Sequence, residues 1–462
     1  MSLRAGAARI PLDPPLGIPM MGYGARQGSA AGRHDPLYAR ALYLADSAGP
    51  ERDLLLLELD LCLMAPAQAD EVRARLAART ALAAERILVG CTHTHSGPDT
   101  GLAVLLAGAA APSHVEPLLQ AAVEAGERAW AEAAPARLGV GRGEAHIGRN
   151  RRSAEGPLDP GVVVVRVDDA EGAPRAVLYL HGCHPTVLGH ENLEYSADWP
   201  GAASRTVEEA LPGALALFAP ASHADVDPRT RGVMDLAVDG QSLGASFEEM
   251  QALGREVGAA VAETALGITT RADAPLAAAS ARLSLPVHGA EGGSEAARAA
   301  LEAGRRDALA ALDLPPDSDA GTGELFALTG ERTRELPAEE CRARRARARR
   351  YLRDRTAARF AGGLEPQVEV QVLVLGDAVL LGLPLEPTVD VGGAWRERLA
   401  SPHACVVGIA NGWLRYLPHP QNFREPGAER SYEVLMSTFV PDAATRLLDR
   451  GEKLLAGLRG AA

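Results

Sequence analysis

The strongest constraint on this chain is an apolar stretch at residues 87–90 that runs directly into the polar residues 91–99, Cys-Thr-His-Thr-His-Ser-Gly-Pro-Asp. The aliphatic stretch predicts the end of a buried strand, and Ser-Gly-Pro-Asp predicts a turn. Because residues two apart on a strand face the same way, His93 and His95 should project from one side of the strand end. Neutral imidazole is a suitable zinc ligand, but paired histidines can equally be ordinary hydrogen-bonded residues. The pair alone leaves both interpretations open.

The segments around this stretch indicate an α/β fold. Residues 54–64 form an apolar run that is typical of a strand in a sheet covered on both faces. An Ala-rich amphipathic helix is predicted over residues 66–84, and the strand at 87–90 then completes a β-α-β unit that should be parallel. Strand and helix patterns alternate further along the chain. We therefore expect a mixed β-sheet core flanked by helices.

The region over residues 289–360 differs from the rest of the chain. It is rich in Ala, Arg and Glu, lacks strand patterns, and contains a Pro-Pro-Asp break that begins at Pro315. Strand patterns return at residues 367–375. We therefore expect one domain over residues 1–462 with a helical insertion at 289–360.

Composition limits the partners and the compartment. The formal net charge of −13 argues against nucleic acid and against an anionic membrane surface as the main partner. The five cysteines lack CxxC spacing, which is typical of free thiols in a reducing compartment. Neither a signal peptide nor an apolar run of roughly 20 residues is present, so we expect a cytoplasmic protein without stable membrane association. The oligomeric state is left open.

Polar or metal-binding side chains follow five predicted strand ends. In sheets flanked by helices such ends open into a common crevice, so residues distant in sequence can converge there. The residues concerned are His93 with His95, His184, Asp225 with Asp227, Glu386, and Tyr416. Two histidines and a carboxylate make a hydrolytic zinc site, in which bound water has a pKa of about 7. Hydrolysis of an amide or ester is the natural reaction, and no nucleotide-binding or Gly-x-Ser-x-Gly motif competes with it.

Several motifs resemble those of one enzyme family. Thr-His-Thr-His-Ser-Gly-Pro at residues 92–98 resembles the signature of the neutral/alkaline ceramidases, zinc amidases that hydrolyse N-acylsphingosine. Further segments similar to that family follow in the same order along nearly the whole chain. They are Asn150-Arg151, Cys183-His184-Pro185-Thr186, residues 383–388 (Leu-Pro-Leu-Glu-Pro-Thr), residues 411–416, and Tyr432-Glu433.

The resemblance implies a fold similar to the ceramidase catalytic domain and a defined set of site residues. Four zinc ligands are implied: His93, His184, Glu386 and Tyr416. His95 would contact the metal-bound water or the substrate. Arg151 and Tyr432 would stabilise the oxyanion, since fixed donors are most useful where charge develops only in the transition state.

One residue departs from the family pattern at the site. Where the family has Gly-Asp-Val-Ser-Pro-Asn with a catalytic serine, this chain has Ala-Asp-Val-Asp-Pro-Arg at residues 224–229, so Asp227 replaces the serine. A serine-dependent step is thereby replaced by attack of zinc-activated water. Asp227 would then act as general base, proton shuttle or anchor for a substrate ammonium group, or would only cap a turn.

We expect neither the C-terminal immunoglobulin-like domain nor the export signal of the family's ceramidases in this protein. We therefore expect a zinc amidohydrolase that acts on a small, soluble amide rather than on membrane ceramide. One alternative is a zinc esterase, lactonase or phosphoesterase, the last with Asp225 and Asp227 as ligands of a second metal. Another alternative is a non-catalytic binding protein on the same fold.

Overall fold

The computed structural model describes residues 3–24, 26–46, 49–101, 110–231, 244–288, 293–311, 313–318, 365–428 and 431–460, with short stretches between residues 337 and 351. Much of the predicted helical insertion, residues 289–360, lies outside the described residues, and so does Cys341. The described part of the insertion begins with helix α6, Gly293–Ala311. The other four cysteines are buried free thiols, as the spacing predicts.

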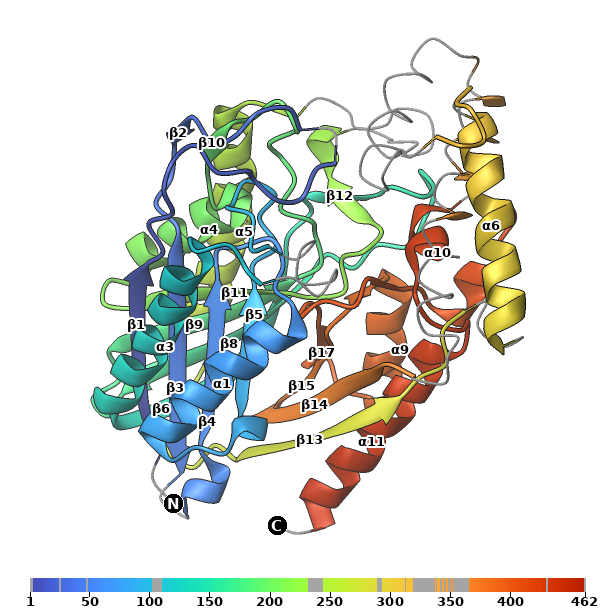
Figure 1. The fold of residues 1–462 in the computed structure, drawn as a ribbon. Helices are drawn as coiled ribbons and strands as arrows, with labels where there is room; N and C mark the ends of the chain where they lie inside the picture. The colour runs from blue at the N-terminus through green and yellow to red at the C-terminus, as the bar shows by residue number, and fades with distance from the viewer. Residues whose placement is uncertain are drawn as a thin grey trace.

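The larger sheet has eight strands in the order β11-β9-β8-β6-β1-β3-β4-β5 (Figure 1). Its strands are β1 (Leu3–Pro11), β3 (Tyr38–Asp46), β4 (Leu54–Leu59), β5 (Ile87–Cys91), β6 (Ala134–Glu144), β8 (Gly161–Asp169), β9 (Pro174–His181) and β11 (Leu215–Pro220). The pairs β4–β5 and β9–β11 are parallel, and the other neighbours are antiparallel. The sheet is therefore mixed, as predicted.

A second sheet lies against the first. It has four strands in the order β13-β14-β15-β17, which are Leu276–Ser284, Gln367–Leu375, Ala378–Gly382 and Ala404–Val407. The apolar layer between the two sheets includes Leu54 and Leu56 of β4 and Leu373 and Leu380 of the second sheet. A sheet-on-sheet core of this kind buries one face of each sheet.

Helices cover the two outer faces. On the larger sheet these are α1 (Pro66–Thr80), α3 (Val115–Ala131), α4 (Asp198–Ala210) and α5 (Phe247–Leu266). On the smaller sheet they are α9 (Val389–Leu399) and α11 (Ala443–Gly460). The described chain is thus layered as helices, sheet, sheet and helices (Figure 1). Within it, no helix is both long and apolar enough to span a bilayer.

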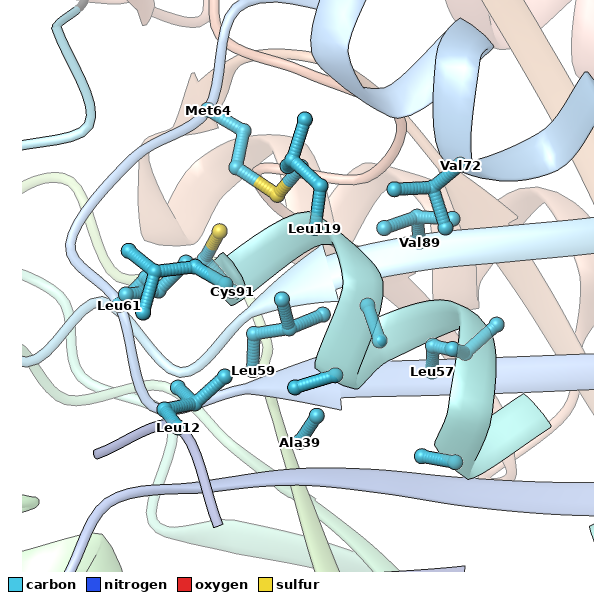
Figure 2. Packing of buried hydrophobic residues seen from close by; sticks show 14 of the residues in the cluster. Leu12, Ala39, Leu57, Leu59, Leu61, Met64, Val72, Val89, Cys91 and Leu119 are labelled. Atoms are coloured by element: carbon cyan, nitrogen blue, oxygen red, sulfur yellow. The ribbon is translucent and has the colours of Figure 1, made fainter. Parts of the chain in front are cut away.

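Strand β4 explains why its sequence is a continuous apolar run. Leu55, Leu57 and Leu59 enter the core beneath α1 and α3, while Leu54 and Leu56 enter the layer between the sheets. Figure 2 shows Leu57 and Leu59 facing the helix α3. Burial on both faces removes the alternation of apolar and polar residues that a half-exposed strand shows.

Short paired segments close the end of the molecule where the polar strand ends gather. They are β2 (Gly32–Arg33) with β10 (Glu194–Tyr195), β7 (Gly148–Asn150) with β12 (Val226–Pro228), and β16 (Glu386–Pro387) with β18 (Tyr416–Leu417). The short helix α10, Tyr432–Met436, contacts β18. Single 3-10 turns lie at Pro50–Arg52, Ala84–Arg86, Arg229–Arg231 and Pro420–Phe423.

Candidate metal centre

His93 reaches the site through a backbone turn rather than through strand alternation. Strand β5 ends at Cys91, and His93 has a φ of 66°, which is a left-handed conformation that is uncommon for a non-glycine residue. The expectation that His93 and His95 share one face of an extended strand is therefore wrong in detail. The two rings nevertheless meet, with centroids 4.7 Å apart and planes at 87°.

Four buried side chains converge at the strand ends: His93, His184, His223 and Glu386. One ligand atom from each lies within 4.8 Å of the corresponding atom of every other. Glu386 Oε2 is 3.5 Å from His93 Nε2, 3.3 Å from His184 Nε2 and 3.9 Å from His223 Nε2. Glu386 Oε2 and the Nε2 atoms of His184 and His223 are buried and have no hydrogen-bond partner among the described residues. Such buried polar atoms are costly unless a further group satisfies them.

Backbone carbonyls fix the orientation of all three imidazoles. The Nδ1 atoms of His93, His184 and His223 lie 2.9, 2.8 and 2.7 Å from the carbonyl oxygens of Cys62, His223 and Ala221, respectively. A carbonyl oxygen only accepts hydrogen bonds, so each Nδ1 carries a proton, and each ring presents a lone pair on Nε2 when it is neutral. Histidine ligands of metals are typically oriented in this way.

Glu386 is arranged to offer one oxygen to the centre. The indole Nε1 of Trp413 donates a hydrogen bond of 2.7 Å to Oε1, which leaves Oε2 facing the imidazoles. Burial raises the pKa of the Glu386 carboxyl, but His93 and His184 outweigh burial and hold that pKa well below 4.5. Glu386 is therefore a carboxylate at neutral pH.

The three histidines of the group differ in protonation state. Burial lowers the pKa of His184, and it lowers the pKa of His223 well below 6.5, so both rings are neutral at pH 7. Burial also opposes a charge on His93, but Cys62 and Glu386 raise the pKa of His93 to about 10. A metal ion that binds His93 would displace a proton from it.

His95 lies at the accessible side of the cluster. Its Nε2 is 3.3 Å from His93 Nε2, and its ring is half-buried against the Tyr23 ring, with centroids 4.8 Å apart. Gly22 packs against the ring and has a φ of 113°. A Cβ at this position would lie only 2.5 Å from the ring, so a larger residue would not fit. Arg26 Nη2 donates a hydrogen bond of 2.8 Å to the carbonyl oxygen of His95. Gly22 and Arg26, which lie between β1 and β2, therefore position His95.

Arg151 lies among acidic and aromatic groups. Its Nε donates to Glu433 at 2.8 Å and its Nη1 to Asp227 at 3.4 Å, while Nη2 is buried without a hydrogen-bond partner. The guanidinium carbon lies 5.4 Å from the ring centre of Tyr432 and 5.8 Å from that of Tyr416. The structure thus brings together the two residues that were predicted to stabilise an oxyanion, Arg151 and Tyr432.

Tyr416 is near the cluster but has other neighbours. Pairing of β16 with β18 sets it opposite Glu386, and its ring lies 5.3 Å from the ring of Tyr432. Burial, followed by the Glu386 charge, raises the pKa of the Tyr416 phenol well above 10. The predicted histidine and glutamate ligands, His93, His184 and Glu386, all belong to the converging group of histidines and carboxylates.

The two aspartates of the 224–229 segment have different partners. Asp225 accepts hydrogen bonds from Val389 N at 2.9 Å and from Arg152 Nε at 3.0 Å. Asp227 lies 3.9 Å from His184 Nδ1 and bonds to Arg151. Burial raises the pKa of Asp227, but Arg151 and then Arg231 outweigh burial, and the net pKa is below 3.8.

Sequence reasoning missed His223 and Trp413. His223 follows the end of β11, just as His184 follows the end of β9, so a histidine beyond a strand end was a usable signal. Trp413 gave no such signal, because its role depends on the turn that precedes β18. In that turn Asn411 and Arg415 have φ values of 61° and 76°.

Residues 12–248 match the family model described as neutral/alkaline non-lysosomal ceramidase, N-terminal. The match spans more than half of the chain and includes three of the converging histidines. The chain belongs to the neutral/alkaline ceramidase family. This membership makes it a hydrolase of amide bonds, with a buried His/Glu group that could bind a metal ion.

Curated relatives agree with this membership. The neutral ceramidase of Mycobacterium tuberculosis is 25% identical over 458 residues, covering 88% of this chain and 70% of that protein. Neutral ceramidase A of Dictyostelium discoideum is 27% identical over 243 residues, and the neutral ceramidase of Pseudomonas aeruginosa is 28% identical over 232 residues. Each of these two alignments covers 46% of this chain and 34% of the relative.

Two solved structures share the fold. A ceramidase complexed with C2 superposes with a TM-score of 0.72 at 20% identity, covering 100% of this chain and 76% of that one. The neutral ceramidase from Pseudomonas aeruginosa gives a TM-score of 0.71 at 22% identity, covering 100% and 75%. The predicted α/β fold, similar to the ceramidase catalytic domain, is confirmed.

Proposed function

We propose that this ceramidase-family chain is a zinc-dependent amidohydrolase that cleaves an N-acyl bond with water as the nucleophile. The observation that carries the proposal is the set of buried Nε2 and Oε2 atoms that converge without hydrogen-bond partners. Neutral imidazoles and a carboxylate are the donors that zinc prefers. Bound zinc would supply water that is acidic near neutral pH and would polarise the acyl carbonyl oxygen.

The chain's own residues would provide the remaining functions. Arg151, with a buried Nη2 and a fixed guanidinium, would donate a hydrogen bond to the developing oxyanion together with the phenol of Tyr432. His95 lies at the accessible side of the cluster, where it would accept or deliver a proton during attack and amine release.

Asp227 fits best as a residue that positions Arg151. A carboxylate whose pKa is held low by two arginines is a weak proton acceptor, which argues against a general base or a proton shuttle. The same arginines compete with a substrate ammonium group for the carboxylate, which argues against an anchor. Asp225 is engaged by Arg152 and by a backbone amide, which supports one metal per chain rather than the two of a phosphoesterase.

The substrate class follows from family membership. The relatives are named ceramidases, which supports an amide with an acyl chain as the bond cleaved. The soluble substrate and the cytoplasmic location that the sequence suggests stay predictions. A panel of N-acyl amides with short and long acyl chains, compared with ceramide in micelles, would distinguish a soluble substrate from a lipid.

The proposal is tested by metal analysis and hydrolysis assays on two matched variants. We expect about one zinc per wild-type chain, release of free amine from N-acyl amides, and loss of both in His184→Ala. His181→Ala is the control, since His181 lies three residues earlier, bonds to the Gly161 carbonyl oxygen and stands outside the converging group. The control should keep its zinc. Wild-type protein that neither binds zinc nor hydrolyses any amide of the panel would refute the function.

A further inference from the structure

We infer that His223 is a direct metal ligand in this chain, in the place that the family resemblance gives to Tyr416. This inference rests on the metal site of the proposed function and refines its ligand set. The ligands would then be three imidazoles and one carboxylate oxygen: His93, His184, His223 and Glu386. Tyr416 would remain a phenol beside the substrate rather than a ligand.

The first support is the orientation of the His223 ring. Its Nδ1 donates to the Ala221 carbonyl oxygen at 2.7 Å, so the lone pair is on Nε2. This Nε2 is buried, and no described residue offers it a hydrogen bond. The ring centroid lies 5.1 Å from that of His93 and 4.7 Å from that of His184. A cation coordinated by the other two imidazoles would therefore lie within reach of His223.

The second support is the spacing of the ligand atoms. Zinc–nitrogen bonds of about 2.0–2.1 Å place tetrahedral ligand atoms about 3.3–3.4 Å apart. From Glu386 Oε2, the three Nε2 atoms lie at 3.3 Å (His184), 3.5 Å (His93) and 3.9 Å (His223). The first two distances are close to the tetrahedral value, the third is longer, and every pair of ligand atoms in the group lies within 4.8 Å.

The third support is the close packing of the backbone against the His223 ring. His223 is fully buried, and a Cβ on Gly408 would lie 3.0 Å from its Cε1. Gly408 follows β17, so the backbone of the second sheet approaches the imidazole closely. A buried imidazole nitrogen without a partner costs free energy, which metal coordination would recover.

The fourth support is that the His223 loop is joined to two other ligands. The carbonyl oxygen of His223 accepts the Nδ1–H of His184 at 2.8 Å. The next residue, Ala224, donates its backbone N–H to Pro387 O at 3.0 Å, directly after Glu386. His223 thus orients one ligand through its backbone and presents another through its side chain.

The surroundings of Tyr416 agree with a different role. Its ring packs edge-on against Tyr432, with the Arg151 guanidinium over both rings. These contacts place the phenol with the predicted oxyanion donors. A phenol there can donate a hydrogen bond to a substrate oxygen without leaving its position.

The test measures ligand identity directly. X-ray absorption spectroscopy of the zinc-loaded wild type should show three imidazoles, and chelator competition should give its zinc Kd. His223→Ala should show two imidazoles and a Kd weakened at least tenfold. Tyr416→Phe should keep three imidazoles and a Kd within threefold of wild type. His223→Gln, which retains a polar side chain, serves if the alanine variant fails to fold.

Two outcomes would count against the assignment in different ways. The first outcome is zinc held by only two imidazoles in the wild type, together with a zinc Kd weakened at least tenfold in Tyr416→Phe. If the wild type still hydrolysed amides, this outcome would overturn the role of His223 but not the proposed function. A wild-type chain that binds no zinc would overturn both the assignment and the proposed zinc-dependent function. Because the number of imidazole ligands is measured on the wild-type protein, this part of the test does not depend on the folding of any variant.

Discussion

At the residue scale, Asp227, which the sequence resemblance places where the family has a serine, contacts Arg151 rather than the converging ligand atoms. Replacing it by Asn would remove the negative charge that holds Nη1 of Arg151 in place. We expect kcat to fall by about 100-fold or more, because a misplaced oxyanion donor costs roughly that much. KM and zinc content should change little. Steady-state kinetics with metal analysis would check this split.

A matched variant two residues away separates catalysis from folding. Asp225→Asn removes the charge that bonds to Arg152 and Val389 N, outside the converging group. We expect it to lose about 2 kcal/mol of stability while keeping its kcat, since charged hydrogen bonds contribute about 1.5–3 kcal/mol. An Asp227→Asn variant with wild-type kcat would mean that Asp227 only shapes the turn.

Individual site residues differ in how far the sequence could predict them. The positions of His93, His184 and Glu386 followed from residue type at strand ends, because ligands gather where strands open into loops. His223 could not be identified as a ligand in this way, since nothing in one sequence says which way its ring points. Its orientation depends on the Ala221 carbonyl and on the space at Gly408, which are features of the folded backbone.

At the element scale, strand β4 contains a carboxyl group in the layer between the sheets. Glu58 is paired across the strands with Gly90, where an added Cβ would lie 2.5 Å from either carboxylate oxygen. Both of these oxygens are buried without a hydrogen-bond partner. Burial, and then the charge of Asp60, raise the pKa of Glu58 well above 4.5.

This raised pKa makes stability depend on pH. The unfolded chain releases the Glu58 proton near pH 4.5, whereas the folded chain retains it to higher pH, so stability falls as pH rises above about 4.5. Glu58→Gln removes this dependence. We expect its stability relative to wild type to increase with pH, by up to about 1.4 kcal/mol per pH unit, until the folded pKa is reached.

Urea unfolding between pH 5 and pH 8 would measure the effect. Glu127→Gln on α3 is the control, because that carboxylate is exposed in an ion pair with Arg79 and should give a difference nearly independent of pH. A constant difference for Glu58→Gln would show that the folded protein ionises Glu58 as readily as the unfolded chain does.

Elements were predictable where their pattern is local. The apolar run of β4 indicated a strand covered on both faces, but the pattern could not say that one cover is a second sheet. The turn before β18 was not predictable, because Asn411 and Arg415 adopt positive φ although neither is a glycine. Tertiary contacts fix that turn, including the bond from Val89 N to Asn411 Oδ1 at 3.0 Å.

At the scale of the whole molecule, the predicted insertion lies between two strands that pair with each other. Strands β13 and β14 are antiparallel along their full length, with Ser284 opposite Gln367. The chain therefore leaves and rejoins the second sheet at one point. We propose that the chain forms a single catalytic domain with residues 289–360 inserted in it. The described residues Ala308, Leu309 and Tyr351 pack in a small cluster of their own, which supports this proposal.

Deletion of residues 289–360 tests this organisation. A short Gly/Ser loop would join residue 288 to residue 361, which keeps the bond from Leu285 N to Pro366 O at 3.2 Å and the bond from His288 N to Thr438 O at 3.0 Å. Because neighbouring strands already define the ends, we expect cooperative unfolding within about 2 kcal/mol of wild type, since shortening a loop changes its closure entropy only slowly. Zinc content should be unchanged.

Deletion of the same length inside the first sheet, residues 134–205, is the control and should prevent folding. If the 289–360 deletion also abolished folding, this region would be part of the catalytic core rather than an insertion in it.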